Sequence, residues 1–190
     1  MTRKEQEGKQ RQEILSTALD IFIKKDYTAT KIQDIAEAAG LSDNLPLIYF
    51  ESKEKLYEEL IKIAKTQSIT ILDSIEGEPL EFFRTAARHV VQHVKTEPYS
   101  AKMFVLLLLA KNNEAVPESV KKLLADNDAF DFSVEKIKHG QQNLSIKEGN
   151  PVTLALIFWG ALQGMVEQML TNSDFSISDI EWIINLIKRE

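Results

Sequence analysis

Two short helices joined by a tight turn are predicted within residues 28–56, and this arrangement leaves few folds open to the chain. Apolar residues such as Ile32 and Ile35 recur at helical spacing, and Thr30 can cap the start of this first helix. Gly40 follows at a place where a chain leaving a helix often needs a left-handed residue. The pattern is that of a helix-turn-helix.

Two serines mark the predicted starts of the next helices. Ser42 can cap the second helix with its side-chain oxygen, which leaves the positive end of that helix facing outward, where a phosphate could dock. Pro46 lies about four residues past this cap, so the second helix is expected to start late or to be distorted. Ser52 can cap a third, longer helix.

Helical spacing continues through the rest of the chain, and no run of strict alternation predicts a strand. Asp26 is expected to take the left-handed position that ends the first helix of the chain. The clearest boundary is the segment 76–79, which ends in a proline. The predicted helices outside the helix-turn-helix pair cover about 9–25, 52–74, 79–95, 98–108, 117–124, 132–139, 154–170 and 177–187, with a weakly patterned segment at 126–131.

The first third of the chain resembles the tetracycline-repressor (TetR) family of bacterial transcription regulators, with no insertion or deletion. The resemblance rests on Phe22, Tyr27, Thr30, Ile35, Ala36, Ala39, Gly40, Leu41, Ser42, Tyr49, Phe50, Ser52, Lys53, Glu54, Lys55 and Leu56. It implies an all-α fold with a three-helix DNA-binding domain at 1–55 and a helical effector-binding and dimerisation domain at 56–190. It also implies that the partner is double-stranded operator DNA.

With this resemblance, we expect two groups of DNA-binding residues. The expected phosphate contacts are Thr30, Ser42, Tyr49 and Lys53. The residues expected to face the groove are Asp43, Asn44, Leu45 and Ile48. Each has a plainer interpretation as a cap, a core residue or an exposed charge. Leu45 and Ile48 offer methyl contacts to bases but no bidentate hydrogen bonds.

The charge balance is unusual for a DNA-binding protein. The whole chain carries a net charge of −6, and residues 1–56 contain nine Lys/Arg against ten Asp/Glu. Because DNA affinity depends largely on phosphate neutralisation, a second hypothesis stays open. In this hypothesis, the protein is a dimer of the same fold that binds a ligand or a protein partner but no specific DNA. Its recognition helix would be degenerate because of Asp43 and Pro46.

The start of the chain carries four basic residues, Arg3, Lys4, Lys9 and Arg11. They predict either a DNA-contacting arm or a solvated terminus.

The resemblance also implies a homodimer that forms through helices near 152–170 and 177–188. Residues 154–170 are apolar nearly all round, and one small chain has little interior in which to bury them together with the last helix. Gly160 and Gly164 lie four apart on one helix face and could permit either a close helix crossing or a bulky neighbour.

The resemblance also implies that the C-terminal half binds an unknown small-molecule effector. The protein would then be a repressor, and binding of a small, largely apolar ligand would release it from its operator. Aromatic and methionine residues there can form the apolar walls of a pocket, or simply a core, and a few polar groups can anchor a ligand. The candidate ligand-binding residues are Phe82, His89, His93, Tyr99, Met103, Phe104, Phe158 and Gln163.

Nothing in the sequence predicts catalysis or a cofactor. There is no cysteine, no P-loop, no G-x-G-x-x-G and no G-x-S-x-G. His89 and His93 have the spacing of two metal ligands, but no third ligand is evident, so we expect no metal. An unrelated, metal-dependent helical enzyme remains the third hypothesis.

The sequence favours a cytoplasmic protein without a membrane partner. The lack of cysteine fits a reducing compartment, and no signal peptide is expected at the start. The most apolar run, residues 103–110, is far shorter than the roughly 20 residues that a membrane-spanning helix needs.

Overall fold

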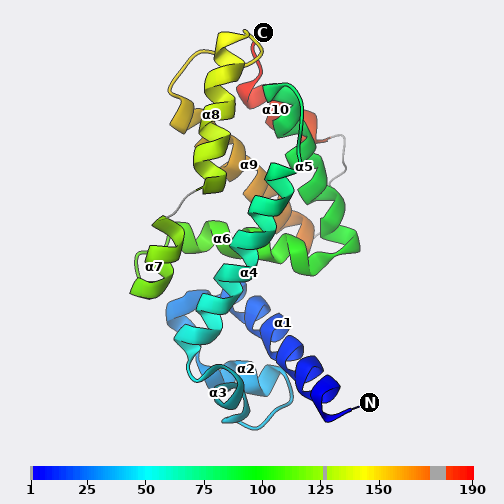
Figure 1. Cartoon of the computed structure of the whole chain (residues 1–190), viewed down its shortest axis with the longest axis vertical. Coiled ribbons are helices and arrows are strands. Elements are labelled where there is room, and N and C mark those ends of the chain that lie inside the picture. Colours follow the sequence, from blue (N-terminus) through cyan, green and yellow to red (C-terminus); the bar gives the residue numbers. More distant parts are fainter. Residues whose placement is uncertain (1, 126–127, 172–178) are drawn as a thin grey trace. The chain divides into compact units, whose positions relative to one another are not determined.

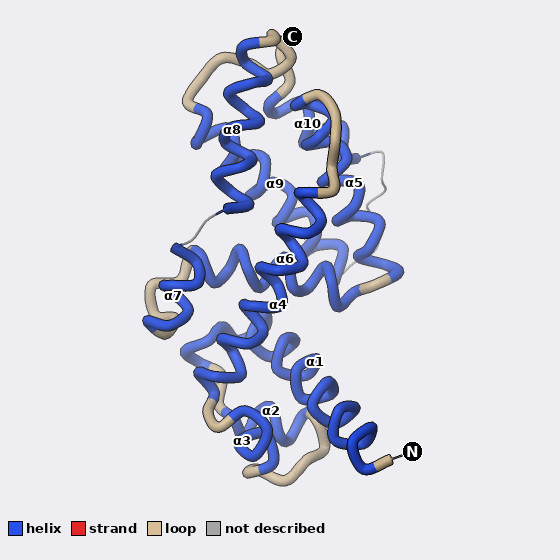
Figure 2. The backbone as a smooth tube through the Cα atoms, in the orientation of Figure 1, coloured by secondary structure: helices blue, strands red, loops and turns tan. Residues whose placement is uncertain are grey.

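The computed structural model of the chain describes residues 2–125, 128–171 and 179–190, and in these ranges it contains helices and no β-strand (Figures 1 and 2). The predicted all-α fold is confirmed. The helices are α1 (Arg3–Ala29), α2 (Ile32–Ala38), α3 (Leu45–Phe50), α4 (Lys53–Asp73), α5 (Pro79–Thr96), α6 (Pro98–Lys111), α7 (Glu118–Ala125), α8 (Asp128–Gln142), α9 (Pro151–Thr171) and α10 (Ile180–Ile187).

The helices form two compact units, and each is described separately. The first unit contains Met1–Lys65 and Leu106–Ala125, and the second contains Thr66–Val105 and Asp126–Glu190. Both α4 and α6 therefore contribute residues to each unit. The functional division predicted from the sequence, at residues 55 and 56, stays a prediction. In packing terms, α7 belongs with the N-terminal helices.

The first unit is built on the apolar side of α1. Its buried residues are Ile14, Leu15, Ala18, Leu19 and Phe22. They are buried together with Ile35 of α2, Phe50 of α3, and Leu56 and Leu60 of α4. Asp26 has a φ of 64°, which confirms the predicted left-handed position, and it interrupts the helical backbone at a kink within α1. The Asp26 carboxylate accepts a hydrogen bond from the Ala29 amide at 3.0 Å.

The start of α1 differs from the sequence prediction. The helix begins at Arg3 rather than near residue 9, because Thr2 and Glu5 cap it reciprocally. The Glu5 amide donates to the Thr2 hydroxyl at 3.3 Å, and the Thr2 amide donates to the Glu5 carboxylate at 2.7 Å. The basic residues near the start therefore lie on a capped helix rather than on an extended arm or a frayed terminus.

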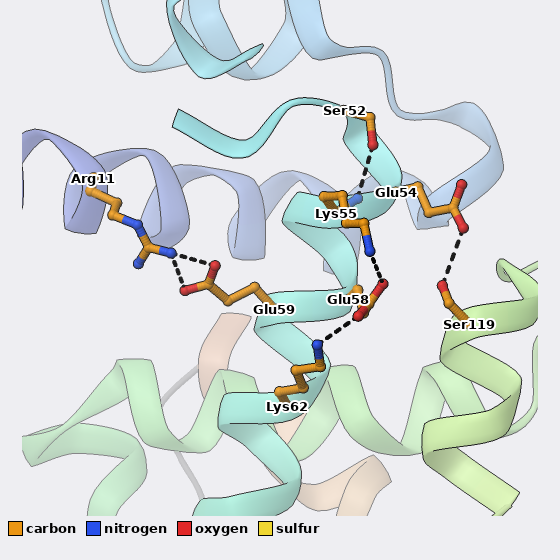
Figure 3. A network of polar contacts seen from close by, with 8 residues as sticks. All are labelled: Arg11, Ser52, Glu54, Lys55, Glu58, Glu59, Lys62 and Ser119. Carbon is orange, nitrogen blue, oxygen red and sulfur yellow. Dashed lines mark hydrogen bonds and ion pairs between the residues drawn. The ribbon is translucent and has the colours of Figure 1, made fainter. Parts of the chain in front are cut away.

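Two contacts attach α7 to α4 within the first unit. The Ser119 hydroxyl donates to the Glu54 carboxylate at 3.1 Å (Figure 3), and the Lys65 ammonium donates to the Leu123 carbonyl at 3.0 Å. The segment 106–125 is thus held to the same helix that follows the helix-turn-helix.

The second unit packs α5, α8, α9 and α10 around an aromatic core. Arg84 of α5 pairs with Glu181 of α10 at 2.8 Å, and an isolated antiparallel bridge joins Ile146 to Lys188. The helix predicted at 132–139 begins earlier, at Asp128, while residues 126–127 of the weakly patterned segment lie outside the described residues. The predicted start of the last helix at 177 also lies outside them, and α10 begins at Ile180.

Gly140 has no room for a side chain, so we expect Gly140→Ala to destabilise the second unit. A Cβ there would lie 2.4 Å from the Cδ1 atom of Ile146, whose side chain is fully buried. Overpacking of this kind costs about 1–3 kcal/mol. Urea unfolding measures the change. Gly8→Ala is the control, since Gly8 is a helical position with open space around it, and it should gain roughly 0.5–1 kcal/mol. Equal effects of the two variants would contradict the assignment.

Candidate nucleic-acid interface

The first helix of the pair begins one residue later than its expected cap. Lys31 is the N-cap of α2, and its amide donates to the Asp34 carboxylate at 2.9 Å. The N-cap predicted for Thr30 is therefore wrong. The Thr30 hydroxyl instead donates to the Asp26 carbonyl at 2.5 Å, and Thr30 is buried.

The turn after α2 follows the sequence prediction. Gly40 has a φ of +67°, a conformation that costs glycine little. The amide of Leu41 donates to the Ala36 carbonyl at 2.9 Å, so the orphan carbonyls at the end of α2 find partners. The predicted role of Gly40 is confirmed.

The second helix of the pair starts late, as Pro46 predicts. Asn44 is the N-cap of α3, and Pro46 lies in the first turn, where its missing N–H breaks no helical hydrogen bond. The cap predicted for Ser42 is wrong, because the Ser42 carbonyl accepts from the Leu45 amide at 2.9 Å in a turn that precedes the helix. The helix end predicted at Ser42 therefore lies at Asn44, and its contact with a phosphate stays a prediction.

The late start decides which side chains of α3 face outward. Pro46 and Phe50 are buried, and Leu45 and Tyr49 are half-buried. The exposed residues are Asn44, Leu47, Ile48 and Glu51, together with Ser42 and Asp43 in the preceding turn. Ile48 is 75% exposed and Leu47 37%. Leu45 is thus less available than Leu47, which the sequence reading did not select. Pro46 was the sequence signal that could have identified Leu47 as outward-facing. A proline in the first turn places the helix cap at Asn44, and residues 44, 47, 48 and 51 then lie on one side.

Contacts from two other helices hold the inner side of α3 in place. The Tyr49 hydroxyl donates to the Gln10 side chain of α1 at 3.1 Å. The Arg11 guanidinium lies 4.8 Å from the centre of the Phe50 ring and also pairs with Glu59 of α4 (Figure 3). Arg11 therefore links three helices, and α3 is supported on a rigid base.

The start of α4 is capped as predicted. The Ser52 hydroxyl accepts from the Lys55 amide at 3.1 Å. One turn further on, Glu58 accepts from Lys55 at 3.2 Å and from Lys62 at 2.6 Å (Figure 3). The hydrogen bond from Lys62 is the main reason why the pKa of Glu58 is lowered.

The Lys53 ammonium lies among backbone carbonyls of the first unit. It donates to the carbonyl of Tyr27 at 2.8 Å and to that of Thr30 at 2.9 Å, and it lies 4.2 Å from the centre of the Tyr27 ring. Burial lowers the pKa of Lys53, and the Asp26 carboxylate opposes that shift. The phosphate contact expected of Lys53 stays a prediction, and the structure shows a second role in fixing the link between α1 and α2.

The candidate ligand-binding residues fall into two groups in the second unit. Phe82 and Phe158 are fully buried and both contact Phe83, with ring centres 5.1 Å and 4.7 Å away. Phe104 joins the same chain of rings through Trp159, whose indole N–H donates to the Ser133 hydroxyl at 3.1 Å. Met103 is also buried. These residues form a packed core, and their contact with an effector stays a prediction.

Among the polar candidates, the two histidines contact each other. His89 and His93 stack with ring centres 4.2 Å apart, and burial, followed by the charge of His93, lowers the pKa of His89. Gln163 donates to Glu167 at 2.8 Å, and Tyr99 is half-buried. Within the described part of the chain, no three His, Cys, Asp or Glu side chains gather as metal ligands would.

Helices α9 and α10 expose apolar side chains. They are Val152, Leu156, Ile157, Trp182 and Leu186, with Trp182 75% exposed and Leu156 57% exposed. Among the described helices, Pro151–Leu170 of α9 is long and apolar enough to cross a membrane by length and composition alone. The core helix of a soluble protein meets the same criterion.

Together, α2, the turn at Gly40 and α3, held on α1 and α4, define a helical protein of the helix-turn-helix class. Residues 14–60 match the family model of the bacterial regulatory proteins of the tetR family. The helix-turn-helix part of the chain thus has the DNA-binding domain of this family, and the relatives of the longer chain are transcriptional regulators.

Three curated relatives illustrate the extent of the similarity. The uncharacterized HTH-type transcriptional regulator YerO of Bacillus subtilis is 22% identical over 96% of this chain and 63% of its own length. AcrR of Shigella flexneri is 24% identical over 90% of this chain and 83% of its own. RutR of Escherichia coli K12 is 30% identical over 51% of this chain and 47% of its own. The chain thus spans less than two thirds of YerO and less than half of RutR.

Solved structures share the fold. A TetR family transcription regulator from Marinobacter aquaeolei VT8 has a TM-score of 0.71, with 19% identity and full coverage of both chains. AibR in complex with isovaleryl coenzyme A and operator DNA has a TM-score of 0.69 at 20% identity, and the match covers 93% of this chain and 97% of AibR.

We expect Lys53→Ala to lower the stability of the first unit, because it leaves two carbonyls without their charged donor. Hydrogen bonds to a charged group contribute about 1.5–3 kcal/mol. Urea unfolding followed by circular dichroism measures the loss. Lys55→Ala is the matched control, since Lys55 is a neighbouring exposed lysine and its partner Glu58 keeps the ion pair with Lys62, and it should cost less than about 0.5 kcal/mol. A Lys53→Ala variant as stable as that control would contradict the positioning role.

Proposed function

We propose that this protein is a cytoplasmic transcriptional regulator without catalytic activity. In this proposal it binds double-stranded operator DNA as a homodimer and is a repressor that a small, largely apolar ligand releases. The observation that carries the proposal is the helix-turn-helix of α2 and α3, which lies within the residues that match the tetR family model. AibR, whose structure holds operator DNA and isovaleryl coenzyme A, is a precedent for such a regulator on this fold.

The DNA contacts that we propose differ in part from those expected from the sequence. Ser42 is exposed and Tyr49 is half-buried, and we keep both as proposed phosphate contacts. The side chains of Thr30 and Lys53 are engaged with backbone carbonyls, and we assign them mainly to positioning α2. Lys31 is exposed at the start of α2, and we add it as a phosphate contact.

The homodimer in this proposal forms through α9 and α10. Their exposed apolar side chains would be costly to leave in water over a contiguous patch, and a two-fold interface would bury the same patch of each subunit against its copy. A dimer places two recognition helices on successive half-sites, about one helical turn of DNA apart or a multiple of it.

Ligand control requires that the ligand prefer one arrangement of the dimer. A ligand shifts an equilibrium only by the difference between its affinities for the two states. We propose that the ligand binds in the second unit near the rings of Phe82, Phe104 and Phe158, with Met103 as an apolar contact. Its polar anchors would come from His89, His93, Tyr99 and Gln163. Helix α4 runs without interruption from the first unit into the second, so a shift in one can reach the other along the helix.

Fluorescence anisotropy tests the DNA-binding function. The probe is DNA from immediately upstream of the protein's own gene, titrated at two salt concentrations with scrambled duplex as competitor. We expect tight, competitor-resistant binding that weakens as salt rises. Lys31→Ala should weaken binding to all duplexes alike and lower the salt slope by about one. Lys138→Ala, which removes an exposed lysine of the second unit, should change neither. Absence of specific binding at both salts would favour a ligand-binding or protein-partner module instead.

Leu156→Glu tests the dimer. A carboxylate in the middle of an apolar interface would have to be desolvated without a partner, so we expect a monomer by light scattering at a concentration where the parent protein is a dimer. Leu144→Glu is the control, because Leu144 is 62% exposed but lies in the loop after α8, and its variant should remain a dimer. A dimeric Leu156→Glu variant would place the interface elsewhere.

A further inference from the structure

The outward side of α3 carries an unusual set of side chains for a surface that meets DNA. Asn44, Leu47, Ile48 and Glu51 follow the i, i+3, i+4, i+7 spacing of one helix side, and all four are exposed. They supply one amide, two aliphatic groups and one carboxylate. The segment 41–51 contains two acids and neither lysine nor arginine.

Each of these groups recognises a different base edge in the major groove. Arginine and lysine are the usual partners of guanine, through its O6 and N7 atoms, and α3 has neither. An asparagine side chain can form two hydrogen bonds with adenine, and an aliphatic side chain can contact the 5-methyl group of thymine. The carboxylate of Glu51 can accept a hydrogen bond from the N4 amino group of cytosine, whereas the amide and the two aliphatic groups match A·T pairs better than G·C pairs.

Ile48 is the residue best placed for a methyl contact. It is 75% exposed in the free protein, and its branched Cβ restricts the side chain to few rotamers. The helix beneath it is held by the Tyr49 hydrogen bond to Gln10 and by the stacking of Arg11 on Phe50. Little conformational freedom remains to be lost when the side chain meets a base, so its apolar surface can contribute directly to discrimination.

We propose that the protein reads thymine methyl groups. Ile48, supported by Leu47, packs against the 5-methyl group of a thymine in each half-site, and Asn44 hydrogen-bonds to an adenine beside it. This inference rests on the proposed function, since it requires that α3 enter the major groove. It assigns specificity to apolar contact rather than to bidentate hydrogen bonds from a cation.

The experiment begins with selection of bound duplexes from a pool of double-stranded DNA with a random core. The enriched duplex is then made with deoxyuridine in place of thymine, one position at a time in both half-sites, and its affinity for the full-length protein is measured. Deoxyuridine lacks only the methyl group. Burial of one methyl-sized group corresponds to a roughly threefold to fivefold change in affinity. We expect a loss of about tenfold or more when the same thymine is replaced in both half-sites.

A variant separates contact by Ile48 from changes in the DNA itself. Ile48→Ala should bind the thymine duplex more weakly, and its affinities for the thymine and deoxyuridine duplexes should differ less than those of the parent protein. The matched control Leu144→Ala removes an exposed leucine of the second unit and should keep the full difference between the two duplexes.

The outcomes distinguish the inference from the function on which it rests. Specific binding that is equally tight for thymine and deoxyuridine at every position would overturn methyl reading while leaving a DNA-binding regulator. If the affinities for the thymine and deoxyuridine duplexes differ as much in Ile48→Ala as in the parent protein, Ile48 does not contact the methyl group. A pool that yields no enriched sequence would overturn the proposed function, and methyl reading with it.

Discussion

Burial of the apolar side of α1 is the constraint on which the first unit depends. Helices as short as α2 and α3, with seven and six residues, are not stable alone in water. They form here because Ile35, Ala36 and Phe50 are buried together with Ile14, Leu15 and Phe22. The polar contacts of Arg11 and Tyr49 then determine how α3 is oriented, whereas the burial of apolar side chains determines that the helix forms at all. A surface built on two such helices is therefore only as rigid as the packing beneath it.

Much of this unit could be predicted from the sequence because its requirements are local. Gly40 and Asp26 occupy positive-φ positions that few residue types tolerate, Pro46 restricts where a helix can begin, and Ser52 has only one nearby helix to cap. Each of these predictions depends on the covalent chain within a few residues. The overall helical fold follows from the same kind of reasoning, since apolar spacing along the chain is also a local property.

The predictions that were wrong concern polar side chains with more than one possible partner. Thr30 could cap α2 or bond to the end of α1, and it bonds to the Asp26 carbonyl, which comes close only after the chain bends. Lys53 shows the same limit, since its two carbonyl partners lie more than twenty residues earlier in the chain. The hydrogen-bond partner that such a side chain takes depends on tertiary structure, and a pattern of residue types does not contain that information. Leu47 and Leu45 differ for a similar reason, because a shift of the helix start changes which of them faces outward.

The negative net charge of the chain and the apolar side chains on α3 both fit a protein whose affinity for DNA depends more on base contacts than on phosphate contacts. The electrostatic part of DNA binding grows with the number of phosphates neutralised and falls steeply with salt. The chain has a net charge of −6, and the segment 41–51, which includes α3, offers no cation to a phosphate. Contacts between methyl groups do not depend on salt in this way, because the hydrophobic effect scales with buried apolar area. A protein that reads DNA through Ile48 and Leu47 would gain little from non-specific phosphate attraction. It would therefore owe a larger share of its affinity to the correct sequence, which suits a regulator that must leave most DNA unoccupied.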